Sequence, residues 1–290
     1  MYNHEKSTLY LFDPITARVH RIPVDKSYAP HLQGASTILF GTTVYFVGSE
    51  TPKDFAVYST DVSDLSDKTE RHITLRGRLN HGRHNIALVR VHASIYAIGG
   101  RETFFHGGHD IGCCERYYPR RDKWTMIPHL KYPRAGIAAC AMSGFVYAAG
   151  GNKFYFERIP FGKIERLDTM DEEKGWVDLT ISPNEEELVR REAGGMCKVG
   201  EHELLLFGGV PDCCHVFTMK NAGIVKRVGG KMKPDVVEFT GSQNAQVVKG
   251  KLFAIDENKS VLHVYGLRKD KWRMTPIQDC TRILDQDLTS

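Results

Sequence analysis

Short apolar runs separated by polar turns recur along the chain and predict paired β-strands. Each unit has one apolar run, a short polar turn, a second apolar run and then Gly-Gly or a remnant of it. The five units are ILFGTTVYFVGS (38–49), LVRVHASIYAIGG (88–100), ACAMSGFVYAAGG (139–151), MCKVGEHELLLFGG (196–209) and VVKGKLFAIDE (247–257). Apolar runs this short, bounded by turn residues, are typical of β-hairpins and not of helices.

The spacing of these units indicates an internal repeat. The first glycine position recurs in four units and is Asp256 in the fifth, with steps of 51, 51, 58 and 48 residues: Gly48, Gly99, Gly150 and Gly208. A third strand and a tryptophan follow in three units: CCERYYPRRDKW (113–124), IERLDTMDEEKGW (164–176) and VLHVYGLRKDKW (261–272). Because a period near 50 residues with paired strands fits one propeller blade per repeat, the sequence predicts an all-β propeller.

The ends of the chain decide how such a ring closes. STLYLFDPITARVHRIPV (7–24) is predicted to form two outer strands with no inner pair before them. The tail CTRILDQDLTS (280–290) is the candidate inner strand, so we expect six blades of four antiparallel strands, the last closed by N- and C-terminal strands. The whole chain, 1–290, is then one domain, with outer strands of the closing blade at 7–24 and repeats at about 33–77, 78–131, 132–182, 189–240 and 241–278.

Two of the repeats resemble a known family. KYPRAGIAACAMSGFVYAAGG (131–151) followed by IERLD, and RHNIALVRVHASIYAIGGRE (83–102) followed by ERYYPRRDKW, resemble the kelch repeats of BTB–kelch substrate adaptors of ubiquitin ligases. The resemblance implies a kelch propeller that binds a protein or peptide on one face and is not an enzyme. It also implies a longer protein, in which an upstream domain such as BTB or F-box would contact the ubiquitin-ligase components.

The predicted binding face carries the loops that join blades and the loops that follow Gly-Gly. The resemblance and the repeat place four arginines there: Arg83, Arg101, Arg134 and Arg191. Because guanidinium groups bind carboxylates in a fork, a ring of arginines would suit an acidic peptide. Tyr132, Phe105 and Tyr155 would add apolar anchors, and Asn244 lies on the last inter-blade loop. The alternative is that each arginine bonds to carbonyl groups of neighbouring loops.

Composition narrows the partner and the compartment. The 290 residues carry a net charge of +4, which permits an acidic partner, while no basic run resembles a nucleic-acid arm and no apolar run is long enough for a membrane span. The seven cysteines are odd in number and include the doublets Cys113-Cys114 and Cys213-Cys214. Adjacent cysteines pair poorly, so we expect a reducing compartment, the cytoplasm and also the nucleus, with a redox role for the doublets as an alternative.

A metal-dependent or sugar-modifying kelch enzyme is the second functional hypothesis. NHGRH (80–84) and HGGHD (106–110) would offer the ligands His81, His84, His106, His109 and Asp110. Their spacing matches no established metal motif, so we expect polar loop histidines and no cofactor. DEEK (171–174) is an acidic cluster between two outer strands, and we expect it to form a solvent-exposed turn.

Overall fold

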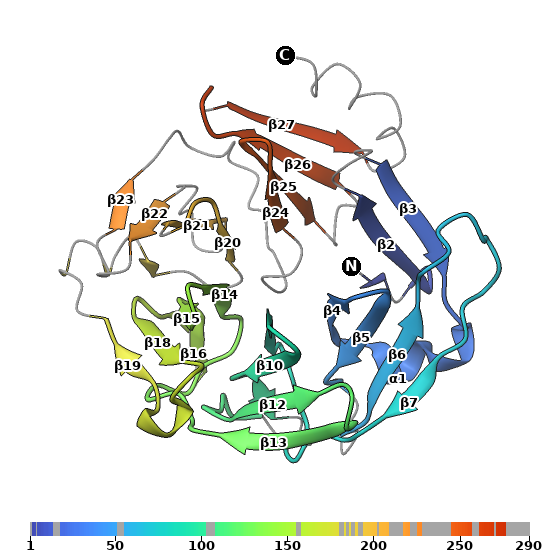
Figure 1. The fold of residues 1–290 in the computed structure, drawn as a ribbon, viewed down its shortest axis with the longest axis horizontal. Helices are drawn as coiled ribbons and strands as arrows, with labels where there is room; N and C mark the ends of the chain where they lie inside the picture. The colour runs from blue at the N-terminus through green and yellow to red at the C-terminus, as the bar shows by residue number, and fades with distance from the viewer. Residues whose placement is uncertain are drawn as a thin grey trace.

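The computed structural model is an all-β propeller whose sheets are arranged as wedges around a centre (Figure 1). It describes residues 2–276 apart from 4, 14–17, 51–54, 103–107, 155–157, 180–182, 184–185, 187–188, 191–193, 202, 209–216, 221–224, 228–244, 257–260 and 270. Five sheets have four strands and one, at the N-terminus, has three. The predicted propeller class is therefore confirmed.

Each four-stranded blade is an antiparallel meander that runs from the centre outward. Blade one contains β4 (Ser36–Phe40), β5 (Thr43–Val47), β6 (Val57–Asp61) and β7 (Thr74–Arg76). Blade two contains β9 (Ala87–Val91), β10 (Ser94–Ile98), β12 (Cys114–Tyr118) and β13 (Lys123–Ile127). Blade three contains β14 (Ala138–Met142), β15 (Phe145–Ala149), β18 (Ile164–Asp168) and β19 (Val177–Asp178).

The remaining two blades follow the same order of strands. Blade four contains β20 (Gly195–Lys198), β21 (Glu203–Phe207), β22 (Phe217–Lys220) and β23 (Val225–Arg227). Blade five contains β24 (Ala245–Val248), β25 (Lys251–Asp256), β26 (Val261–Gly266) and β27 (Lys271–Pro276). All five predicted hairpins form the two inner strands of a blade.

The expectation of six four-stranded blades is not met, because the described residues form five. The sixth position in the ring holds the N-terminal sheet of β1 (Tyr2–Asn3), β2 (Thr8–Asp13) and β3 (Arg18–Pro23), between blades five and one (Figure 1). A short strand therefore does precede the two predicted outer strands, since β1 pairs with Thr8 and Leu9 of β2. The proposed inner strand at 280–290 lies outside the described residues.

Tight turns at the inner hairpins explain their register. The turns of blades three and five have positive φ at both central residues, Ser143-Gly144 and Lys249-Gly250. Two positive φ angles define a type I′ turn, whose twist matches that of the flanking strands. The polar pairs between the apolar runs thus set which residues of the two strands lie opposite each other.

The conserved spacing of the Gly-Gly pairs has a steric basis. Gly99 has φ of +58°, and a Cβ added to it would lie 2.6 Å from the carbonyl oxygen of Arg134, in the next blade. The N–H of Gly100 donates to that same oxygen at 3.0 Å. Glycine is required here because two blades approach each other through their backbones.

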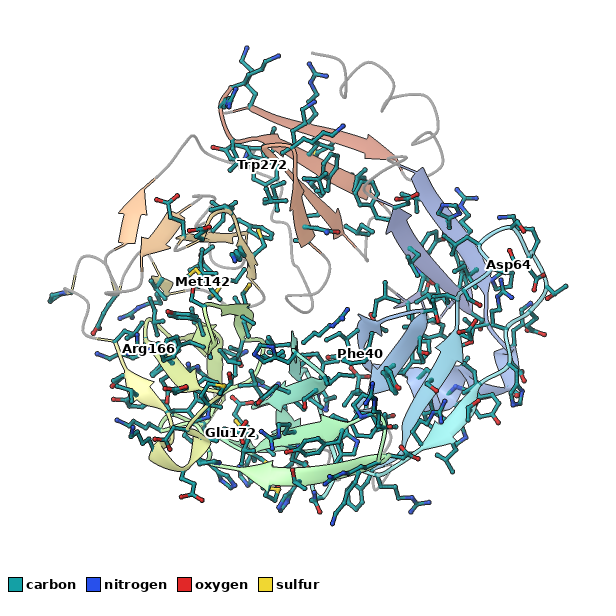
Figure 2. The ribbon with its side chains drawn as sticks, viewed as in Figure 1. Phe40, Asp64, Met142, Arg166, Glu172 and Trp272 are labelled. Atoms are coloured by element: carbon teal, nitrogen blue, oxygen red, sulfur yellow. The ribbon has the colours of Figure 1, made fainter. Side chains whose placement is uncertain are left out.

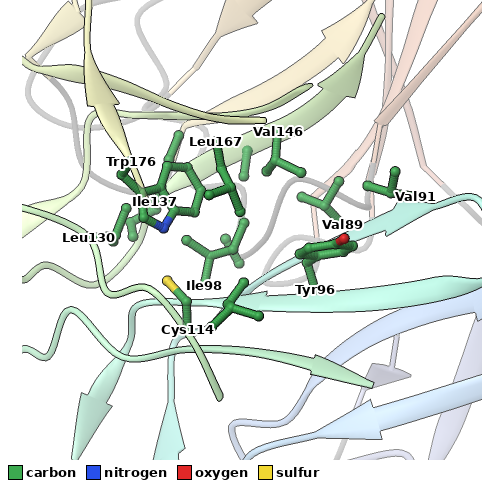
Figure 3. Packing of buried hydrophobic residues seen from close by; sticks show 14 residues of the cluster. Val89, Val91, Tyr96, Ile98, Cys114, Leu130, Ile137, Val146, Leu167 and Trp176 are labelled. Carbon is green, nitrogen blue, oxygen red and sulfur yellow. The ribbon is translucent and has the colours of Figure 1, made fainter. Parts of the chain in front are cut away.

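Apolar side chains fill the space between neighbouring wedges. Figure 3 shows the cluster between blades two and three, in which Tyr96 and Ile98 of one blade share a core with Leu167 and Trp176 of the other. Between blades one and two, Tyr117 stacks on Trp124 with ring centres 4.9 Å apart. Tyrosine and tryptophan side chains thus help to fill the space between wedges at these positions.

Helices are minor in the part of the chain that the structure describes. A 3-10 turn η1 (Lys26–Tyr28) and helix α1 (Ala29–Leu32) precede blade one, and a second 3-10 turn, η2 (Glu172–Lys174), joins β18 to β19. Among the described residues, none of the helices has the length and apolar character needed to cross a membrane.

Candidate functional site

Arg83, which opens blade two, lies inside its blade. Its side chain is 0 % exposed and forms an ion pair of 2.5 Å with Glu115 on β12. Its Nε donates to the carbonyl oxygen of Gly99 at 2.9 Å and its Nη1 to that of His81 at 2.8 Å. The guanidinium therefore ties the blade-opening loop to the second and third strands of the same blade.

Arg134 repeats this arrangement in blade three. It is 0 % exposed and ion-paired with Glu165 on β18, and it donates to the carbonyl oxygens of Tyr132 at 3.3 Å and Ala148 at 3.2 Å. The expectation that Arg83 and Arg134 face a partner does not fit this burial. The geometry instead matches the alternative, in which such arginines bond to nearby carbonyl groups.

The glutamates of these pairs were missed by reasoning from the sequence. Burial opposes ionisation of Glu115, but Arg83 and the backbone and side-chain amides of Asn80 outweigh it, so the pKa of Glu115 lies below its usual value. Glu165 also accepts from the N–H of Lys131 at 2.7 Å. The sequence did contain a signal, because both glutamates are the second residue of the third strand, in CERYY and in IERLD.

Blade one shows that the fold accepts an apolar pair at the same two positions. Ser36 opposes Val47 as Ala87 opposes Ile98, so Leu32 corresponds to Arg83. Val57 opposes Val47 as Cys114 opposes Ile98, so Tyr58 corresponds to Glu115. Leu32 and Tyr58 are both buried in one apolar cluster.

A second group of polar residues lies beyond the Gly-Gly pairs, and we call it the polar rim: Glu50, His84, Arg101, Asp110 and Asn152. Glu50, Arg101 and Asn152 each lie two residues after the first glycine of their blade. Arg101 pairs through Nε with Asp110 at 2.8 Å, and its Nη2 lies 3.3 Å from Oδ1 of Asn152. The polar rim therefore links equivalent positions of neighbouring blades.

Backbone pairing holds the polar rim in place. In blade two, β8 (Arg83–His84) pairs with β11 (Arg101–Glu102), and the N–H of Glu102 donates to the carbonyl oxygen of His109 at 3.0 Å. In blade three, Asn152 pairs with Ala135. Residue 152 also begins β16 (Asn152–Phe154), which pairs with β17 (Arg158–Pro160).

His84 is the titratable centre of the polar rim. Burial lowers its pKa, Glu50 and Asp110 act in the opposite direction, and Arg101 reinforces the lowering. Its Nδ1 is buried and has no hydrogen-bond partner among the described residues. Glu50 itself is exposed and accepts from the side-chain amide of Gln33 at 3.2 Å.

The other predicted contact residues are scattered. Tyr132 donates to Asp178 at 2.7 Å and packs beside Phe161, with ring centres 5.2 Å apart, so it joins two loops of blade three. The remaining four lie outside the described residues: Phe105, Tyr155, Arg191 and Asn244. Of the eight predicted contact residues, Arg101 alone belongs to the polar rim as described.

The metal ligands considered from sequence do not form a cluster. Within the described residues, no three His, Cys, Asp or Glu side chains are placed to hold a metal ion. His81 and His109 are exposed, the carboxylate of Asp110 pairs with Arg101, and His106 lies outside the described residues. His84 belongs to the polar rim.

The cysteine doublet of blade two lies in the core. Cys113 and Cys114 are 3 % and 0 % exposed, and burial raises the pKa of their thiols to about 11 and about 12. A thiolate-based redox role needs the opposite shift. Cys213 and Cys214 lie outside the described residues.

The sequence predicted that the acidic turn of blade three, 171–174, is exposed to solvent. The structure differs, because Glu172 in this turn is largely buried. Glu172 accepts from the hydroxyl of Tyr96 and from Arg116 at 2.7 Å, both of blade two (Figure 2 labels Glu172 at the outer edge). Its carboxylate is 15 % exposed. The turn therefore couples two blades.

A pocket of about 320 Å³, lined mostly by apolar residues, lies away from the polar rim, between blade five, the N-terminal sheet and blade one. Its walls come mainly from β2, β4, β24 and β25. Phe12 and Phe253 stack beside it, with ring centres 4.8 Å apart.

Comparisons with known proteins agree with this architecture. No protein-family model matches the chain. It is 24 % identical to Kelch-like protein 23 of Pongo abelii over 212 residues, which is 72 % of this chain and 34 % of the relative. It is 29 % identical to Kelch-like protein 26 of Mus musculus over 118 residues, 40 % of this chain and 18 % of the relative. The chain therefore spans about a third or less of these curated relatives.

Two further similarities extend the comparison. Alpha-scruin of Limulus polyphemus is 28 % identical over 118 residues, 39 % of this chain and 12 % of that protein. A solved structure, described as the structure of YjhT, superposes with a TM-score of 0.65 over 83 % of both chains at 14 % identity, which shows the fold alone. Together with the Gly-Gly repeats and the four-stranded meanders, these similarities support a kelch-repeat β-propeller. Propellers of this kind typically serve as protein-interaction modules.

Proposed function

We propose that this propeller binds a short segment of a partner protein over the polar rim. The observation that carries the proposal is the variation at one repeat position. Glu50, Arg101 and Asn152 share a backbone position fixed by the Gly-Gly pair, yet they differ in charge and hydrogen-bonding capacity. A rigid repeat that presents varied polar side chains on loops is typical of a recognition surface.

We propose further that the partner segment is acidic and that Arg101 binds its carboxylate. Arg101 already holds the carboxylate of Asp110 through Nε, which supports this chemistry. Because Arg83 and Arg134 are buried, Arg101 is the predicted contact arginine that supplies positive charge to the polar rim within the described residues. The specificity of the site would then depend on one guanidinium and on the neutral and acidic groups beside it.

A role as substrate receptor of a ubiquitin ligase is the finer form of this proposal. It is supported by the resemblance of the repeats in blades two and three to those of BTB–kelch adaptors, and it requires ligase-binding elements outside this chain. A cytoplasmic and nuclear location accompanies this proposal and stays a prediction. No observation on the described residues favours the metal-dependent enzyme.

Quantitative affinity purification tests the proposal. Wild-type protein would be compared with Arg101→Ala and with Lys269→Ala, an exposed cation on blade five, after each variant is shown to unfold at the wild-type temperature. We expect at least one partner to be lost with Arg101→Ala and kept with Lys269→Ala. A peptide from that partner should bind about tenfold more weakly when its acidic residues become amides. Retention of every partner by Arg101→Ala would place the recognition site elsewhere.

A further inference from the structure

The outer edge between blades one and two carries an excess of positive charge. Gly77 follows β7, and its N–H donates to Oδ1 of Asp122, in the turn before β13, at 2.8 Å. The ends of β7 and β13 meet there, far from the centre of the ring (Figure 1). Five cations lie within two residues of this contact, and we call them the basic edge: Arg76, Arg78, Arg120, Arg121 and Lys123.

Close backbone packing fixes the two strands of the basic edge relative to each other. A Cβ on Gly77 would lie 2.5 Å from the carbonyl oxygen of Asp122, so the two backbones touch. Asp122 has φ of +48°, and the N–H of Arg121 donates to the carbonyl oxygen of Tyr118 at 2.9 Å, which closes the turn. The cations therefore project from a defined surface.

The carboxylate of Asp122, beside the basic edge, and that of Glu172, further along the outer edge of the ring, already have other partners. Oδ1 of Asp122 accepts from the hydroxyl of Tyr117 at 2.5 Å as well as from Gly77, and it forms no ion pair among the described residues. Glu172, at the far side of blade two, is held by Arg116 and Tyr96. Four members of the basic edge are exposed and Arg76 is half-buried, and none of the five forms an ion pair within the described part of the chain.

Apolar side chains lie on the same two strands. Leu75 on β7 is 54 % exposed and Met126 on β13 is 41 % exposed. Arginines beside exposed apolar residues are typical of protein interfaces, where the apolar groups are buried and the guanidinium forks bind carboxylates. The exposed leucine and methionine therefore favour a protein partner over a nucleic acid, whose phosphate backbone would be bound by the cations alone.

We infer that the basic edge is a second docking surface, which binds an extended acidic segment of a partner protein. The cations of the basic edge would bind acidic side chains of the partner segment by charge complementarity. Leu75 and Met126 would contact apolar side chains that lie between those acidic residues. The surface is separate from the polar rim, since it lies on the outermost strands.

A matched pair of variants tests the inference. The turn sequence recurs as RKDKW at 268–272. Blade five lies on the opposite side of the ring from blade two (Figure 1). Arg120→Ala/Arg121→Ala/Lys123→Ala and Arg268→Ala/Lys269→Ala/Lys271→Ala remove the same charge from exposed equivalent positions. Binding of a fluorescein-labelled peptide of about ten glutamates would be followed by fluorescence anisotropy at low salt.

The expected results separate this surface from general charge attraction. The blade-two triple variant should bind the peptide at least about tenfold more weakly, the blade-five triple variant within about twofold of wild type, and a glutamine peptide not at all. The affinity purification above tests Arg101 and this anisotropy assay tests the basic edge, so the two proposals can fail or succeed independently. Equal losses in both triple variants would overturn it, as would tighter binding of a single-stranded oligonucleotide of equal charge.

Discussion

Arg83 and Glu115 form an ion pair in which both side chains are 0 % exposed. Removing two charges from water costs several kcal/mol per ion, and their attraction offsets this cost only when the remaining donors and acceptors are also bonded. Here the carbonyl oxygens of Gly99 and His81 and the amides of Asn80 bond most of them, while Nη2 of Arg83 is buried with no hydrogen-bond partner among the described residues. The pair therefore stabilises the blade as a unit, and loss of either partner leaves a buried charge.

Arg83→Leu should lower the free energy of unfolding by about 3–5 kcal/mol, because Glu115 would remain buried without its cation. Adding Glu115→Tyr should restore much of the loss, since Leu and Tyr fill the same two positions in blade one. Urea unfolding of wild type, single and double variants measures both effects. If the double variant were as unstable as the sum of both single changes, the analogy with blade one would fail.

The stability of the protein should fall in acid through Glu115. Its folded pKa is below the unfolded value of 4.5, so its contribution is present above pH 4.5 and is lost as the pH falls through the folded pKa. The free energy of unfolding, measured by urea between about pH 6 and pH 3, should therefore decline more in wild type than in Glu115→Gln. A parallel decline in both proteins would assign the acid sensitivity to other carboxylates.

Tyr96 should ionise late in the folded protein. Burial and the Glu172 carboxylate raise its pKa from 10.0 to about 12, so its contribution to stability is complete below pH 10 and is lost as the pH rises toward 12. Ultraviolet titration of tyrosinate should show a late step in wild type that is absent in Tyr96→Phe. In Glu172→Gln the step should move to lower pH, and an unchanged step would contradict the contact between the blades.

Gly99→Ala should destabilise the protein more than Gly144→Ala. Both glycines have positive φ, which costs alanine about 1–2 kcal/mol, but Gly144 has no atom within 4 Å of an added Cβ. At Gly99 the new methyl group would meet the Arg134 carbonyl oxygen and separate blades two and three. Thermal unfolding of the two variants isolates this steric effect, and equal losses would mean that the blades can move apart without cost.

Cys113 and Cys114 should react slowly with thiol reagents in the folded protein. Burial raises the pKa of both thiols, so almost none of the reactive thiolate is present near pH 7.5. Alkylation followed by peptide mapping should label them only after unfolding. Rapid labelling of Cys113 in the native protein would revive the redox hypothesis.

The blade pattern of strands, glycines and tryptophans could be predicted from sequence, whereas the partners of the charged side chains could not. Gly99 and Trp124 signal blade geometry because each has one steric role in every repeat where it occurs. The orientation of Arg134 depended on Glu165, a residue on another strand, and a guanidinium on a loop bonds equally well to carbonyl groups or to a partner. The short strand β1 was missed because its two residues are too few to show an alternation of apolar and polar side chains.

The same dependence on partners explains the rest of the candidate site. The polar rim follows from the position after Gly-Gly, but the pairing of Arg101 with Asp110 needs the loop between them to fold back. The turn containing Glu172 looked solvent-exposed because its partners, Tyr96 and Arg116, lie in another repeat. A sequence pattern defined within one repeat does not predict contacts between side chains of different repeats.

Arg134 belongs to two blades at once, since its side chain bonds within blade three while its carbonyl oxygen accepts from Gly100 of blade two. Changing the number of residues between Arg134 and β14 would therefore shift both contacts out of register. Tags and extra sequence should be accepted at the hairpin tips of the outer strands, where one blade alone is affected, and rejected just before the innermost strands. The length of the segment between Arg134 and β14 is thus constrained by two blades at once.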